Sequence, residues 1–220
     1  MKTAAPAAPV RVPPQFDTPA QQDAAATLGL WVFLATELMF FGPLFFGYSY
    51  GRSHFLQAFA VASRHTDVVL GSVNTAVLLT SSFTMALAAG MRKADGRRAA
   101  MWLLWATAAL GIAFLFIKGT EYLHDWQQHL IPGTGFALGQ GDSAGAQLFF
   151  FLYFATTALH AVHLTLGISV TGVFAFALRR GAVQFANGER IELVALYWHF
   201  VDVIWIFLYP ILYLVGRSGG

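Results

Sequence analysis

The sequence has no cysteine among its 220 residues. Without a thiol, the chain forms no disulfide and offers no cysteine ligand for haem attachment, an iron–sulfur cluster or a thiolate copper site. Charge is also scarce, since Asp, Glu, Lys and Arg make up 11% of the residues, against roughly 25% in a soluble domain. The formal net charge is only +2. The composition therefore argues against a soluble globule and gives no support to nucleic-acid binding.

What the chain has instead is apolar residues, at 57% of the total, including 21 Phe. They concentrate in five long runs, at 28–50, 68–91, 100–121, 147–178 and 193–215. Each run reaches the ~20 residues that a transmembrane helix needs, and none alternates as the strands of a membrane barrel do. We therefore predict an all-α integral membrane protein, a bundle of five transmembrane helices. The fourth run is the longest and is expected to tilt or protrude.

Basic residues in the connecting segments predict the orientation of this bundle. The N-terminal side carries nine of them: Lys2, Arg11, Arg92, Lys93, Arg97, Arg98, Arg179, Arg180 and Arg190. The opposite side carries three: Arg52, Arg64 and Arg217. The positive-inside rule then places the N-terminus in the cytoplasm and the C-terminus outside. The Pro- and Ala-rich residues 1–26 are expected to form a disordered tail before a membrane domain at 27–217.

Few ionisable side chains fall within the five runs. Glu37 lies near the middle of the first, where a carboxylate costs about 3 kcal/mol on insertion scales. Such a residue either hydrogen-bonds another helix or belongs to a site. Lys118 and Glu121 are three residues apart near the outer end of the third run, so they share a helix face. We predict an interfacial ion pair in which the lysine snorkels toward water.

Histidines provide the other polar groups at depth. His160 and His163 are three residues apart, as are His199 and Asp202, so each pair shares a helix face. Together with Glu37 they could bind zinc or iron, but the Glu-x-x-His pairs of four-helix di-iron proteins are absent. We favour an interhelical hydrogen-bond network of proton-related groups. We predict neither a catalytic residue nor a metal ligand in this chain.

Five segments resemble helices of subunit III of the haem-copper oxidases. The last run, ELVALYWHFVDVIWIFLYPILYLVG, is similar to the family's final helix with its Y-W-H-F-V-D-x-x-W signature. The first run, LGLWVFLATELMFFGPLFFGY, resembles the helix that carries the carbodiimide-reactive glutamate, at the position of Glu37. VNTAVLLTSS, KGTEY and LHAVHLTLG match the three helices between them. The match covers 28–217 and lacks the two additional N-terminal helices of the seven-helix form, so the chain resembles the five-helix form.

The resemblance implies an accessory subunit of cytochrome c oxidase that holds no haem or copper. In the family, subunit III packs on subunit I within a complex that also contains subunit II, binds phospholipid and sustains proton uptake. The residues agree, because an oxygen-reducing centre with a low-spin haem needs six histidines in one chain. Only three histidines of this chain lie at depth, namely His160, His163 and His199. The expected location is the bacterial cytoplasmic membrane, with several passes.

Two alternatives stay open at this point. The corresponding subunit of a quinol oxidase, or the related accessory protein of nitric oxide reductase, also has five helices. Quinol-oxidase relatives tend to carry Asp at the position of Glu37, which favours cytochrome c oxidase. A free-standing proton-coupled transporter that uses Glu37 is the more remote alternative, because the five runs show no inverted repeat and no paired broken helices.

Overall fold

A computed structural model describes residues 14–94, 96–138, 143–182 and 186–217. All regular structure within these ranges is helical. The elements in chain order are α1 (Pro19–His54), α2 (Leu56–Arg64), α3 (Val68–Lys93), α4 (Arg97–Gln127), α5 (Ser143–Arg180), α6 (Gly188–Tyr209) and the π-helix η1 (Pro210–Leu214). Five of the described helical stretches are long and apolar enough to cross a membrane, with η1 extending α6. The predicted number and order of spans are confirmed.

The first helix begins earlier than the sequence indicated. Thr18 caps it, because its hydroxyl oxygen accepts a hydrogen bond from the backbone N–H of Gln21 at 3.2 Å. Pro19 follows in the first turn, where its missing N–H costs nothing. Residues 19–26 are therefore helical, which corrects the predicted end of the tail at residue 26. The part of that tail at 1–13 lies outside the described residues.

The connection between the first two spans contains a short helix that the sequence did not indicate. α2 buries one face, including Ala58 and Phe59, and packs against α5. Gly145 in α5 permits this close approach, because a Cβ there would lie 2.8 Å from the Cβ atoms of both Ala58 and Phe55. The connection is thus a packed part of the bundle.

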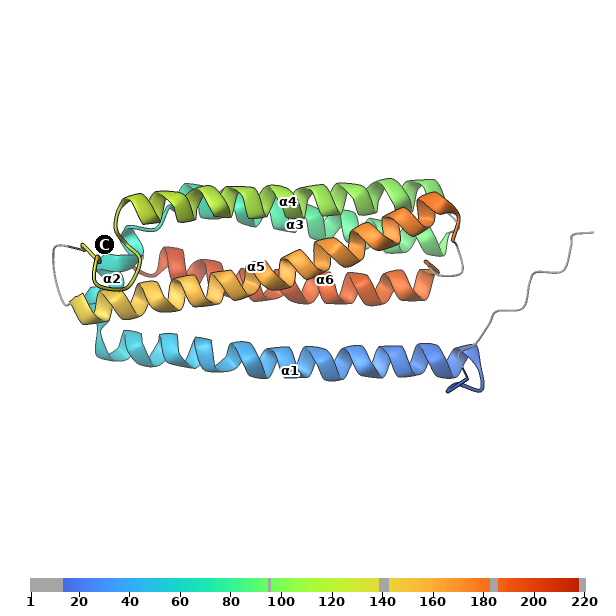
Figure 1. Ribbon diagram of the computed structural model, residues 1–220, viewed down its shortest axis with the longest axis horizontal. Helices are drawn as coiled ribbons and strands as arrows, with labels where there is room; N and C mark the ends of the chain where they lie inside the picture. Colours follow the sequence, from blue (N-terminus) through green and yellow to red (C-terminus); the bar gives the residue numbers. More distant parts are fainter. Residues whose placement is uncertain (1–13, 95, 139–142, 183–185, 218–220) are drawn as a thin grey trace, which may run out of the picture.

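Figure 1 shows the long helices running side by side, with α5 crossing the bundle obliquely. α3 and α4 pack as a hairpin, α6 packs on α3 and α5, and α1 packs on α5 and α6. The start of α1 and the α3–α4 and α5–α6 connections lie at one end, whereas α2 and the C-terminus lie at the other. α1 is largely uncovered, and only four of its residues are buried: Leu34, Phe41, Tyr48 and Gly51.

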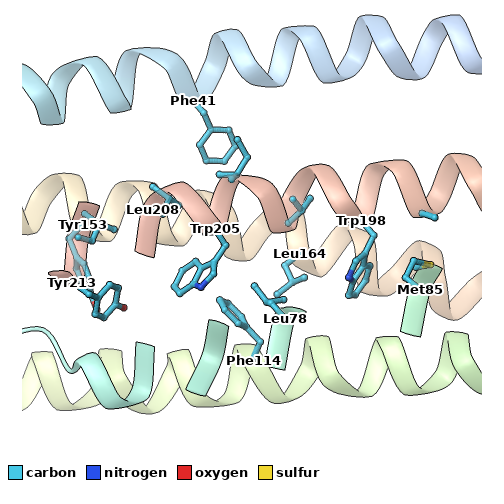
Figure 2. Close-up of a cluster of buried hydrophobic side chains, with 14 of the residues drawn as sticks. Phe41, Leu78, Met85, Phe114, Tyr153, Leu164, Trp198, Trp205, Leu208 and Tyr213 are labelled. Carbon is cyan, nitrogen blue, oxygen red and sulfur yellow. The ribbon is translucent and has the colours of Figure 1, made fainter. Parts of the chain in front are cut away.

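Large aromatic side chains fill the space between α3, α4, α5 and α6. Figure 2 shows Trp205 of α6 beside Phe114 of α4, and the two ring centroids are 4.7 Å apart in an edge-on arrangement. The indole N–H groups of α6 set its register on α3. Trp198 donates to Ser81 at 3.1 Å and Trp205 donates to Thr75 at 3.0 Å. The core is therefore both apolar and hydrogen-bonded.

Pro210 changes the last helix without breaking it. α6 ends at Tyr209, and Pro210–Leu214 continue as a π-helix. Proline has no N–H for the i−4 carbonyl, and a π-turn accommodates that gap. Tyr213 lies within this π-helix, and its side chain is fully buried.

Candidate functional site

The densest polar cluster in the described structure surrounds Lys118 of α4. Its Nζ donates hydrogen bonds to Glu121 Oε2 at 3.0 Å, to the Tyr153 hydroxyl at 2.8 Å and to the Tyr213 hydroxyl at 2.6 Å. Both tyrosine hydroxyls lie 2.7 Å from Glu121 Oε1 and donate to it. We call Lys118, Glu121, Tyr153 and Tyr213 the lysine cluster. It joins α4, α5 and η1, so it holds three separate segments together.

The predicted ion pair is thus present, but its predicted surroundings were wrong. Lys118 is 2% exposed and Glu121 is 1% exposed, so the lysine does not snorkel to water. The Lys118 ammonium also lies 4.4 Å from the centroid of the Tyr153 ring. Hydroxyls and aromatic faces replace water around the charge, which is why it can stay inside the bundle.

A second carboxylate extends the lysine cluster toward the end that carries the C-terminus. Asp125 lies one helical turn beyond Glu121, is 3% exposed, and has its Oδ2 3.2 Å from the Tyr153 hydroxyl. A cavity of about 440 Å³ opens there, and both carboxylates line it together with residues at the start of α3. One side of the lysine cluster therefore faces the protein interior, and the other side faces this cavity.

Glu37 finds its partner on α5. Its Oε2 lies 2.7 Å from His163 Nε2, and the His163 Nδ1 lies 2.8 Å from the carbonyl oxygen of Leu159. Nδ1 therefore carries a proton and donates it to that carbonyl. Tyr197 of α6 donates to the His163 carbonyl at 2.9 Å. This pair joins α1 to α5 and can hold a proton between a carboxylate and an imidazole.

His199 and Ser82 form a second polar contact between spans. His199 Nδ1 lies 2.6 Å from Ser82 Oγ, and the imidazole is half-buried between α6 and α3. Asp202, three residues on in α6, also faces the Ser82 side chain. Its side chain is buried, and neither carboxylate oxygen has a hydrogen-bond partner in the described part of the chain. His199 and Asp202 thus both face Ser82, and of the two only His199 makes a hydrogen bond of ordinary geometry among the described residues.

His160 likewise departs from the expected network. Although it shares a helix with His163, it packs between Phe114 and Trp205, with ring centroids 5.5 Å and 5.1 Å away. Neither ring nitrogen has a hydrogen-bond partner among the described residues. Asn74 of α3 is buried in the same unpartnered state. Despite their three-residue spacing, the two histidines lie in different surroundings. His163 faces α1, whereas His160 faces the aromatic core.

Sequence reasoning missed the two tyrosines and Asp125. The spacing of Lys118, Glu121 and Asp125 is i, i+3 and i+7, which places all three on one face of α4 and was the available signal. Tyr153 and Tyr213 carried no such signal, since they are 35 and 95 residues from Lys118. Within the described ranges, no group of three or more His, Asp or Glu side chains is arranged to hold a metal ion.

The fold and these sites define a class: a multi-pass helical membrane protein with buried polar contacts between its spans. A family model described as cytochrome c oxidase subunit III matches residues 17–217. The match begins at residue 17, two residues before α1 and before residue 28, where the sequence resemblance began.

Three relatives illustrate the range of this family. The chain is 32% identical over 195 residues to cytochrome c oxidase subunit 3 of Alkalihalophilus pseudofirmus, covering 87% of each chain. It is 29% identical over 194 residues to quinol oxidase subunit 3 of Bacillus spizizenii, covering 87% of this chain and 88% of the relative. It is also 30% identical over 192 residues to the heme-copper oxidase subunit I+III of Aeropyrum pernix, covering 84% of this chain and 22% of that longer protein.

The chain belongs to the cytochrome c oxidase subunit III family. It is thus a subunit of a multi-subunit haem-copper oxidase complex, and the relatives include both cytochrome c and quinol oxidases.

Proposed function

We propose that this chain is the accessory subunit III of a proton-translocating cytochrome c oxidase in a bacterial cytoplasmic membrane. It packs on subunit I in a complex with subunit II, binds phospholipid and sustains proton uptake, while haem and copper reside in the partners. Its N-terminus lies in the cytoplasm, since nine of its basic residues fall on that side of the spans. The proposed membrane domain covers 27–217, and the segment before it, 1–26, includes the first turns of α1 from Pro19 onward.

The observation that carries this proposal is the Glu37–His163 pair. It is the ionisable contact through which α1 attaches to α5, at 2.7 Å, and it sits near the middle of the 36-residue α1. The Glu37 side chain is 16% exposed, so it reaches the surface where a neighbouring subunit or lipid lies. The remaining deep histidines, His160 and His199, lie in separate surroundings, which fits a chain that leaves the redox chemistry to its partners.

The direct test is purification of the affinity-tagged chain in mild detergent with visible spectroscopy of what accompanies it. We expect haem absorption from a co-purifying subunit I and oxidation of reduced cytochrome c by the complex. Oxidation of a quinol instead of cytochrome c would assign the chain to the quinol oxidases, whose subunit 3 from Bacillus spizizenii is similar to it. A chain that purifies alone, free of haem, would overturn the proposal.

Glu37→Ala is expected to leave the haem content of the complex unchanged and to shorten its active lifetime during turnover. The physical reason is that the variant removes a partly buried carboxylate that contacts His163, without touching a haem ligand. The measurement is oxygen consumption against time, together with the haem spectrum.

Glu37→Gln separates proton exchange from structural support. The amide keeps the hydrogen bond to His163 but cannot release a proton at this depth. We expect the glutamine variant to lose lifetime as the alanine variant does. Full rescue by glutamine would show that the contact is only structural, and loss of haem absorption in either variant would contradict the separation from the redox centres.

A further inference from the structure

His199 reaches the surface of the bundle at a depth where water is absent. It lies near the middle of the span at Gly188–Leu214, and its partner Ser82 lies near the middle of α3. The contact of 2.6 Å between Ser82 Oγ and His199 Nδ1 occupies one ring nitrogen. The other nitrogen, Nε2, has no hydrogen-bond partner in the part of the chain that the structure describes. The imidazole is only half-buried, so Nε2 is accessible from outside.

The surface around His199 is otherwise apolar and open. Leu79 and Phe83 of α3 are 50% and 63% exposed, and Val203 and Ile206 of α6 are each 45% exposed. Their spacings of i, i+4 and i, i+3 place each pair on one side of its helix, next to the contact that joins the helices. We call this surface the α3–α6 face, and it consists of Leu79, Ser82, Phe83, His199, Val203 and Ile206.

Lipid cannot satisfy the exposed nitrogen. Acyl chains at the centre of a bilayer offer no hydrogen-bond donor or acceptor. Whichever ring nitrogen carries the proton, Nε2 is either an N–H donor or a lone-pair acceptor, so it needs a polar partner. A polar group at this depth marks a contact with another protein segment in most membrane proteins. Glu37, the other mid-depth group that reaches the surface, already pairs with His163 inside the chain.

The α3–α6 face also has room for a helix. Ala86 and Gly90 continue the exposed side of α3 toward its C-terminal end, and a Cβ at Gly90 would meet no atom within 4 Å. Small residues at such positions let a second transmembrane helix approach closely, and polar side chains then bond across the contact. The small residues on α3 and the unpartnered His199 nitrogen therefore favour the same occupant, a transmembrane helix that carries a polar group.

We propose that a transmembrane helix of the haem-bearing subunit I packs on the α3–α6 face and exchanges a hydrogen bond with His199 Nε2 at mid-membrane depth. The identity of this partner rests on the proposed function. The partner helix contributes a hydroxyl, a carboxamide or a backbone carbonyl at that depth, and apolar side chains on either side of it.

Site-specific photocrosslinking in membranes tests the face. Phe83 is replaced by p-benzoylphenylalanine, and the matched control carries the same replacement at Phe116, which is 73% exposed on α4. We expect a crosslink to subunit I from position 83 and none from position 116. A crosslink only from position 116, or none from position 83 in a complex that retains its haem subunit, overturns the α3–α6 assignment alone. Failure of any haem subunit to co-purify with the unaltered chain overturns the proposed function instead.

Two substitutions of His199 test the hydrogen bond. In His199→Gln the amide reaches the place of Nε2, whereas in His199→Asn it reaches only the place of Nδ1 and Ser82. We expect the asparagine variant to release subunit I about three- to twentyfold faster in detergent, as loss of one interhelical hydrogen bond in a membrane implies. The glutamine variant should stay close to the unaltered chain. Equal behaviour of the two variants, retained or lost, would show that His199 acts only within this chain.

Discussion

Lys118→Met is expected to lower the free energy of unfolding by about 3–5 kcal/mol, because it leaves an uncompensated buried carboxylate. Glu121 is 1% exposed, and among the described residues its short contact to a cation is the one with Lys118, at 3.0 Å. The variant also removes the ammonium that Tyr153 and Tyr213 contact at 2.8 Å and 2.6 Å. Thermal unfolding of the purified complex, followed by loss of this subunit, measures the effect.

The double variant Lys118→Met with Glu121→Gln is the decisive comparison. It removes both charges, so no uncompensated carboxylate remains at this position, and it should recover a large part of the lost stability. Thr120→Val serves as the control on the same helix, since Thr120 is exposed and such changes usually stay within about 0.5 kcal/mol. If the double variant is as unstable as Lys118→Met, the ion pair is not the source of the effect.

Trp205→Ala is expected to cost about 3–5 kcal/mol, which is typical of removing a large buried aromatic side chain. Trp205 is 1% exposed, packs edge-on against Phe114 at 4.7 Å and donates a hydrogen bond to Thr75 at 3.0 Å. Its loss opens a cavity where α3, α4 and α6 meet and frees the register of α6 on α3. The melting temperature of the complex and its resistance to proteolysis report the change.

Trp102→Ala provides a matched control for that experiment. Trp102 belongs to α4, but it is 68% exposed, so its removal leaves no internal cavity. We expect it to change the melting temperature far less than Trp205→Ala does. Comparable losses from the two alanine variants would mean that stability comes from contacts outside the aromatic core.

The fold was predictable to the extent that it follows from local hydropathy. A run of about 20 apolar residues indicates a span wherever it occurs, and all five predicted runs are helices at the expected places. The boundaries were less accurate. α1 starts at Pro19 and α2 lies in a segment expected to be a connection, because a capping threonine and a short helix packed on α5 carry only weak signals.

The sequence identified residues of the candidate site but did not predict which of them contact each other. Glu37 and His163 were recognised separately, and their 2.7 Å contact joins residues 126 positions apart. The equal spacing of His160 and His163 suggested a shared role, yet His160 faces Phe114 and Trp205 instead. A helical spacing shows which side chains share a face, but it does not show which neighbouring helix that face meets.

By itself, then, the sequence determined the membrane class, the five spans and the residues that are costly to bury, since each of these depends on a short stretch of chain and its transfer energy. Only the tertiary structure decided which of those residues meet. It brought Tyr153 and Tyr213 to Lys118 across 35 and 95 residues, and it left His160 without a hydrogen-bond partner among the described residues. The reason is geometric, because the rotation and crossing of packed helices arise from the fit of many side chains at once.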